Sequence, residues 1–163
     1  MANCLIIIDL QRGLHTETAP LYQLDKVLRI ANERITDYRK KNLPIIFIQH
    51  KDQELVPATD PWKLMKQLDN RGSDYYIEKT HANSFYRTSL SNLLTELAVK
   101  EIEFCGAQTE YCVDTTIRVA HSLGYTLSMI RGSTTTLDSQ ELTAEQIINH
   151  HEAIWNQRFL TFI

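Results

Sequence analysis

The sequence has no block of charges of one sign, and this limits the partners that the protein can bind. Its formal net charge is -3, and acidic and basic residues are interspersed along the chain. A protein that binds a nucleic-acid backbone needs a concentrated basic surface to neutralise the phosphates. We therefore expect no nucleic-acid partner.

Long hydrophobic runs are also missing. Aliphatic stretches such as residues 5–8 and 45–48 are far shorter than the roughly 20 apolar residues that a membrane-spanning helix needs. The start of the chain lacks a positively charged segment followed by an apolar signal core. We therefore expect a cytoplasmic protein that does not bind membranes.

Cysteine is scarce, and the three cysteines cannot all pair within one chain. In a reducing cytosol we expect Cys4, Cys105 and Cys112 to be free thiols. Cys4 and Cys105 lie within apolar strand-like stretches and are expected to be core residues. Cys112 falls at the predicted start of a helix, where free backbone N–H groups and the helix dipole lower a thiol pKa. Cys112 is therefore the candidate nucleophile, with core packing as its alternative role.

The remaining composition is that of an ordinary globular protein. Hydrophobic residues make up 43% of the chain and charged residues 23%, and no segment is of low complexity. A chain of 163 residues forms one hydrophobic core more readily than two. We expect a single domain that spans residues 1–163.

Strand and helix patterns alternate along the chain. Apolar runs typical of strands buried on both faces occupy residues 4–8, 45–48, 102–105 and 126–130, and shorter strand candidates lie at 75–79 and 159–163. Helical spacing covers residues 21–41, 90–100 and 113–123, and a potential capping box at 143–146 opens a last helix. This order predicts an α/β, Rossmann-like three-layer αβα fold with a mostly parallel sheet of about six strands.

Three reactive side chains fall where such a sheet binds ligands, beyond the carboxyl ends of its strands. Asp9 follows an aliphatic run, so its carboxylate is expected to be buried and to need a cation. Lys79 ends another strand candidate and can supply that cation while stabilising a thiolate at Cys112. Taken singly, Asp9 could be a helix cap and Lys79 a solvated surface charge. Their convergence with Cys112 at one edge favours a catalytic site.

The residues around these side chains resemble the isochorismatase-like cysteine hydrolase superfamily. The resemblance is carried by IIIDLQ at 6–11, EKT at 78–80 with SF at 84–85, and GAQTEYCV at 106–113. It is closest to the streptothricin hydrolase-like branch, through QHKD at 49–52 and ELVP at 54–57. The resemblance covers nearly the whole chain and implies the same αβα fold.

The resemblance implies a catalytic triad of Asp9, Lys79 and Cys112. It also implies a cis peptide between Ala107 and Gln108, and an oxyanion hole made by the backbone N–H groups of Gln108 and Cys112. The implied reaction is cleavage of a C–N bond in a small amide, lactam or ureido compound through an acyl thioester. No cofactor is implied, and family members commonly assemble as homodimers or homotetramers.

The expected substrate contacts are less specific than the triad. Gln11 and three aromatic residues in the predicted loops, Trp62, Phe85 and Tyr111, are candidates, because small-molecule pockets are usually lined by aromatic and apolar side chains. The alternative for the aromatic residues is ordinary packing in the loops.

A metal site is not expected from the histidines and aspartates. Nicotinamidases of the family bind a metal through an aspartate and two histidines after the second strand, and His50, Asp52 and His81 do not reproduce that spacing. Whether His50 and Asp52 touch substrate or are structural stays open. Two alternative functions also stay open, a nicotinamidase-type amidase and a non-catalytic binder of small molecules on the same fold.

Overall fold

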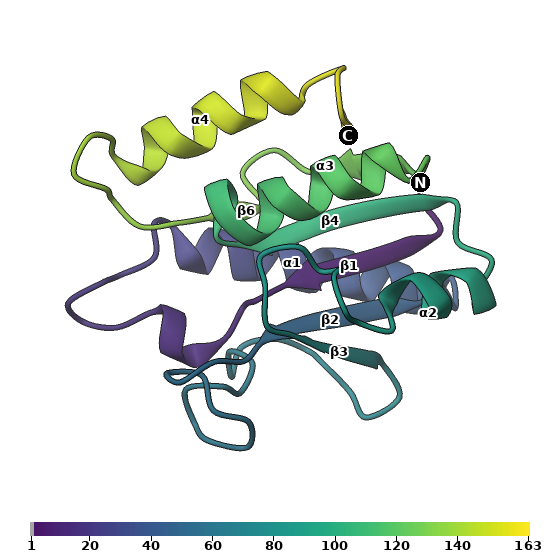
Figure 1. Ribbon diagram of the computed structural model, residues 1–163, viewed down its shortest axis with the longest axis horizontal. Coiled ribbons are helices and arrows are strands. Elements are labelled where there is room, and N and C mark those ends of the chain that lie inside the picture. The colour runs from purple at the N-terminus through teal and green to yellow at the C-terminus, as the bar shows by residue number, and fades with distance from the viewer. Residues whose placement is uncertain (1) are drawn as a thin grey trace.

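The computed structural model describes residues 2–163 and has the three layers predicted from the sequence (Figure 1). Within these residues the strands form one seven-stranded sheet with the order β3-β2-β1-β4-β5-β7, and β6 pairs with β4. Every strand pairing in this sheet is parallel. The strands are β1 (Cys4–Ile8), β2 (Ile45–His50), β3 (Tyr75–Lys79), β4 (Glu101–Ala107), β5 (Thr126–Met129), β6 (Thr134–Thr135) and β7 (Thr161–Phe162).

Helices cover both faces of the sheet. Figure 1 shows α1 (Leu24–Lys40) on one face and α3 (Asp114–Ser122) on the other, with α4 (Ala144–Trp155) beside α3. The short helix α2 (Leu90–Glu96) packs into the same apolar cluster as α3. A 3-10 helix, η1 (Arg12–Leu14), follows β1, and a π-helix, η2 (Thr109–Val113), leads into α3.

The position of β1 in the middle of the sheet, with helices over both faces, explains why its residues are all apolar. Ile6 and Ile8 point into the cluster under α3, whereas Leu5 and Ile7 point into the cluster under α1. Because both faces of a doubly covered strand are buried, the sequence shows a continuous aliphatic run rather than alternation. Burial on both faces also holds for β2 and for β4 after its first residue, whereas β5, which was likewise predicted, alternates between buried and more exposed side chains.

Some predicted boundaries change in the structure. The capping box at Thr143 and Gln146 is present and opens α4, as predicted. The helix predicted from residue 113 is instead preceded by η2, so the turn that holds Cys112 is π-helical. Strand β6 was not predicted, because its two threonines are too few to show any periodicity.

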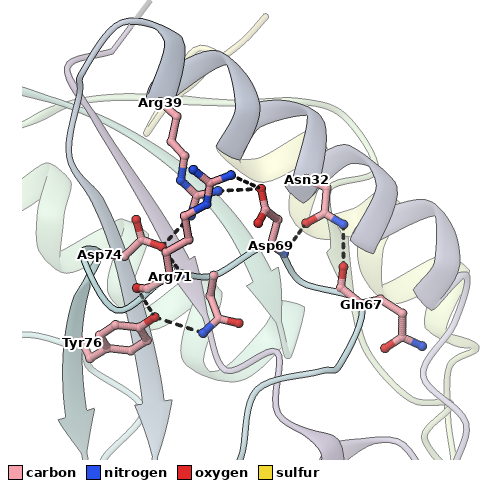
Figure 2. A network of polar contacts seen from close by, with 8 residues as sticks. Asn32, Arg39, Gln67, Asp69, Arg71, Asp74 and Tyr76 are labelled. Carbon is pink, nitrogen blue, oxygen red and sulfur yellow. Dashed lines mark hydrogen bonds and ion pairs between the residues drawn. The ribbon is translucent and has the colours of Figure 1, made fainter.

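The long loop between β2 and β3 is tied to α1 by side-chain contacts (Figure 2). Arg39 of α1 bridges Asp69 at 2.6 Å and Asp74 at 2.7 Å. Asn32, two turns earlier, donates to the Gln67 carbonyl at 2.7 Å and accepts from the Asp69 N–H at 2.9 Å. The loop is therefore a defined part of the fold, and its residues 62–65 bond to residues 10–12, which follow the carboxyl end of β1.

The carboxyl edge also needs one glycine. Gly106 lies opposite Ile8 in the β1–β4 register, with φ +136°, and a Cβ atom there would sit 2.1 Å from the Ile8 carbonyl oxygen. Only glycine allows β4 to approach β1 this closely as it turns toward η2.

Among the described residues, no helix combines the length and the apolar character needed to cross a membrane.

Candidate active site

Asp9, Lys79 and Cys112 meet at the carboxyl edge of the sheet. Asp9 follows β1, Lys79 is the last residue of β3, and Cys112 lies in η2 after β4. The Lys79 ammonium nitrogen is 2.6 Å from Asp9 Oδ2 and 3.1 Å from Cys112 Sγ. The structure therefore brings together the three side chains that the sequence predicted to converge, with Lys79 as the bridge.

The strand order explains how Lys79 reaches the other two residues. Strand β2 separates β1 from β3, and His50 at its end is the register partner of Lys79. The Lys79 side chain extends across the end of β2, where its ammonium lies 3.2 Å from His50 Nδ1. His50 therefore belongs to the same cluster, a role that the sequence left open.

The charges in this cluster are almost fully withdrawn from water. Asp9 and Lys79 are each 1% exposed and form a buried ion pair. Burial raises the pKa of the Asp9 carboxyl above its ordinary value, and the neighbouring Lys79 ammonium opposes that rise. The carboxylate thus has a stronger affinity for a proton than an exposed aspartate, which suits it to accept one.

The sequence predicted a lowered pKa for the Cys112 thiol because it lies near a helix start, and the structure contradicts this. Burial raises its pKa to about 12, and the negative charge of Asp9 adds to the rise, while Lys79 lowers it. The ligand atoms of Asp9 and Cys112 lie within 4.8 Å of each other, so the thiolate would form beside a carboxylate in a poorly hydrated site. The resting group is therefore the thiol, and its ionisation needs a proton acceptor.

The turn before Cys112 has the backbone geometry that the family resemblance implies. The peptide bond between Ala107 and Gln108 is cis. The Gln108 carbonyl accepts hydrogen bonds from the N–H groups of Tyr111 and Val113, both at 3.2 Å. The oxyanion role of the Gln108 and Cys112 N–H groups stays a prediction.

The other two cysteines are core residues, as predicted. Cys4 and Cys105 are buried and, like Cys112, are free thiols. Burial raises the pKa of both thiols, as it does for Cys112, but only Cys112 of the three contacts the Lys79 ammonium among the described residues.

The Gln11 side chain is bonded to backbone groups, and its contact with substrate stays a prediction. Its side chain is fully buried, and its amide nitrogen donates to the carbonyls of His50 at 2.9 Å and Trp62 at 2.8 Å. Its amide oxygen accepts the His50 N–H at 2.8 Å. Gln11 therefore clamps the end of β2 to the following loop, and its polar atoms are already engaged.

Trp62 lines a cavity of about 560 Å³ together with Gln49 and Glu78. Gln49 and Glu78 are register partners one position before His50 and Lys79. Because successive strand side chains point to opposite faces, this cavity lies on the other face of the sheet edge from the Lys79 cluster. A contact of Trp62 with substrate stays a prediction.

The remaining two aromatic candidates have different surroundings. Phe85 packs against the apolar cluster under α3 and stacks on Tyr125, with ring centroids 6.1 Å apart. Tyr111, next to the nucleophile candidate, is 58% exposed. Phe85 thus has the packing role considered as its alternative, whereas Tyr111 is free to meet a ligand.

The side chains considered for a metal site are engaged in other contacts. Asp9, His50 and Cys112 offer ligand atoms within 4.8 Å of one another, and one atom of each, Asp9 Oδ2, His50 Nδ1 and Cys112 Sγ, contacts the Lys79 ammonium. His81 pairs with Thr80 Oγ1 at 2.9 Å instead.

Comparison with known proteins identifies the family of this chain. The pattern of the isochorismatase domain matches residues 3–153. A solved structure described as an isochorismatase family protein is 54% identical, covers 98% of this chain and 96% of its own, and superposes with a TM-score of 0.97.

Two named relatives are more distant. Streptothricin hydrolase of Streptomyces noursei is 25% identical over 139 residues, which are 83% of this chain and 55% of that protein. Nicotinamidase 3 of Arabidopsis thaliana is 24% identical over 162 residues, which are 89% of this chain and 78% of that protein. With a domain match over nearly its whole length, a closely superposing structure and these relatives, the chain belongs to the isochorismatase family.

Proposed function

We propose that this protein is a cysteine hydrolase that cleaves a C–N bond of a small amide, lactam or ureido compound through an acyl thioester on Cys112. The observation that carries the proposal is the bridge made by Lys79, whose ammonium contacts both a buried carboxylate and the only cysteine that is not fully buried among the described residues. The isochorismatase family is a family of hydrolases, and the name of one relative, a nicotinamidase, denotes action on an amide.

The first step follows from the thiol pKa. Because burial and the Asp9 charge raise the pKa of Cys112 well above neutral pH, a preformed thiolate is scarce. Asp9 therefore takes the thiol proton as the sulfur forms its bond to the carbonyl carbon. The carbonyl oxygen becomes an oxyanion, for which the N–H groups of Gln108 and Cys112 are the proposed donors.

The second step releases the amine. The C–N bond breaks as the tetrahedral intermediate collapses, and Asp9 returns its proton to the leaving nitrogen. Asp9 then takes a proton from water, whose oxygen attacks the thioester carbonyl. The carboxylic acid leaves, and the sulfur recovers its proton from Asp9. Lys79 balances the negative charge in the site throughout, and no step requires an electron carrier or a metal.

The proposal is tested with a panel of amides, lactams and ureido compounds that includes nicotinamide. We expect turnover of at least one compound by the wild type and its loss in Cys112→Ala. The matched control is Cys105→Ala, which removes a buried thiol on β4 outside the cluster and is expected to retain turnover. Turnover that survives Cys112→Ala would exclude the covalent mechanism. Binding of a panel compound without turnover would favour the non-catalytic alternative.

A further inference from the structure

The Lys79 ammonium has three protons, and the structure provides three acceptors for them. They are Asp9 Oδ2 at 2.6 Å and Cys112 Sγ at 3.1 Å, which belong to the proposed reaction, and His50 Nδ1 at 3.2 Å, which does not. The Lys79 side chain has no exposed surface, so water is not available to replace a missing acceptor. A buried N–H without a partner is costly, and the third acceptor is therefore needed.

This contact determines the protonation of His50. A lysine ammonium can only donate, so Nδ1 must carry a lone pair, and the neutral ring must hold its proton on Nε2. Nε2 lies 3.4 Å from Asp52 Oδ2, which can accept that proton. Burial and the Lys79 charge lower the pKa of His50, which agrees with a neutral ring.

The imidazole is held in this position from both ends. Gln11 engages the His50 backbone N–H and carbonyl, as described above. Asp52 is itself fixed by the N–H groups of Glu54 at 2.8 Å and Leu55 at 2.7 Å, which bond to its Oδ1 and leave Oδ2 toward the ring. A chain of contacts thus runs from the loop after β2, through His50, to the ammonium.

We propose that His50 is a positioning residue for Lys79: its Nδ1 accepts the third ammonium proton and thereby aims the other two at Asp9 and Cys112. An ammonium held in this way stabilises the negative charge that develops on sulfur without having to reorient. The proposal rests on the proposed function in one respect, because it assigns the charge on sulfur to a hydrolytic reaction. The positioning of Lys79 itself also affects the reactivity of the free Cys112 thiol, which can be measured without a substrate.

The first test is spectroscopic and needs no substrate. Histidine labelled with ¹⁵N is read by long-range ¹H–¹⁵N correlation at pH 7.5, and the His50 signals are assigned by their loss in His50→Asn. We expect a neutral ring with an unprotonated Nδ1 and a protonated Nε2. A ring protonated on Nδ1, or on both nitrogens, would overturn the proposal. Charged groups facing the ring are Lys79, Asp9 and Asp52, with His81 nearby.

The second test compares two variants by the rate at which iodoacetamide labels Cys112. Asparagine places its amide oxygen close to the position of Nδ1, so His50→Asn keeps an acceptor, whereas His50→Leu does not. We expect His50→Leu to slow labelling by about tenfold, because Lys79 with an unpaired buried proton stabilises the thiolate less well. We expect His50→Asn to restore the rate to within about threefold of the wild type. His150→Leu, which removes an exposed imidazole on α4, is the control.

The outcomes separate the two proposals. If both His50 variants label at the same rate, the positioning role is wrong, whether or not an amide is hydrolysed. If labelling follows the expected order and no panel compound is turned over, His50 still positions Lys79 and the proposed function fails. Where a substrate is found, His50→Leu should lower kcat with little change in KM, and His50→Asn should recover kcat. A role in packing alone would not produce that recovery.

Discussion

Replacing Asp9 by asparagine should change thiol reactivity and hydrolysis in opposite directions. The substitution keeps the shape of the side chain and an oxygen acceptor for Lys79, but it removes the negative charge beside the sulfur. That charge is a cause of the raised pKa of Cys112. The variant should therefore form a thiolate more readily while lacking the group that accepts the proton during catalysis.

The size of the effect follows from the geometry. At a separation of 4.8 Å, the upper limit for these ligand atoms, and an effective dielectric constant of about 20, the lost repulsion is worth about 3.5 kcal/mol. This would raise the thiolate fraction by about 300-fold, and the lower nucleophilicity of a more acidic thiol cancels roughly half of that gain on a logarithmic scale. Alkylation of Cys112 should therefore become about 10- to 20-fold faster.

The assay is limited labelling with iodoacetamide at neutral pH, followed by peptide mapping, beside turnover of any amide found in the panel. Turnover should fall by about 10²- to 10⁴-fold, which is the usual contribution of a general base. Asp25→Asn, which removes an exposed carboxylate at the start of α1, is the control and should change neither rate. Slower labelling of Asp9→Asn would refute the claim that the Asp9 charge holds the thiol protonated.

Three further predictions concern the same centre and its support. Lys79→Met should slow labelling of Cys112 by at least about tenfold, because the cation that opposes the rise in the thiol pKa is lost; Lys51→Met, at an exposed ion pair, should not. The pH profile of kcat/KM should be measured in His50→Asn, so that residue 50 does not titrate. Its acid side should have a midpoint above pH 3.8, because the pKa of Asp9 is raised and protonated Asp9 cannot accept a proton. A midpoint at or below pH 3.8 would contradict this. Glu103→Gln should lower the free energy of unfolding in urea by about 2–3 kcal/mol, because the buried Glu103 pairs with Arg34 at 2.6 Å and accepts a hydrogen bond from the Tyr38 hydroxyl at 2.9 Å. The control Glu33→Gln, at an exposed ion pair, should lower it by less than about 0.5 kcal/mol. Equal losses in the two variants would contradict this prediction.

The convergence of the three reactive residues could be predicted because it depends on strand ends. The continuous aliphatic runs before Asp9 and before Gly106 identify doubly buried strands, and parallel strands deliver their carboxyl ends to one edge. Lys79 was harder, because β3 is an edge strand with an alternating pattern, and its register beside His50 places the side chain. The family resemblance supplied the pairing of these residues as a triad.

The pKa of Cys112 could not be predicted from its position in the sequence. A helix start does favour a thiolate, but the direction of the shift is decided by burial and by the distance to Asp9, which is 103 residues away in the chain. The part played by Gln11 was missed for a similar reason. Its bonds are to backbone groups of His50 and Trp62, and a sequence pattern carries no signal for such partners.

The central claim is tested most directly by trapping the acyl enzyme. The protein is mixed with an excess of an amide that it turns over, quenched in acid during steady state, digested and mapped by mass spectrometry. The account predicts that the peptide containing Cys112 gains the mass of the acyl group, that hydroxylamine removes it, and that Cys112→Ala shows neither adduct nor turnover. Steady turnover with no adduct on Cys112, together with turnover that persists in Cys112→Ala, would contradict the account.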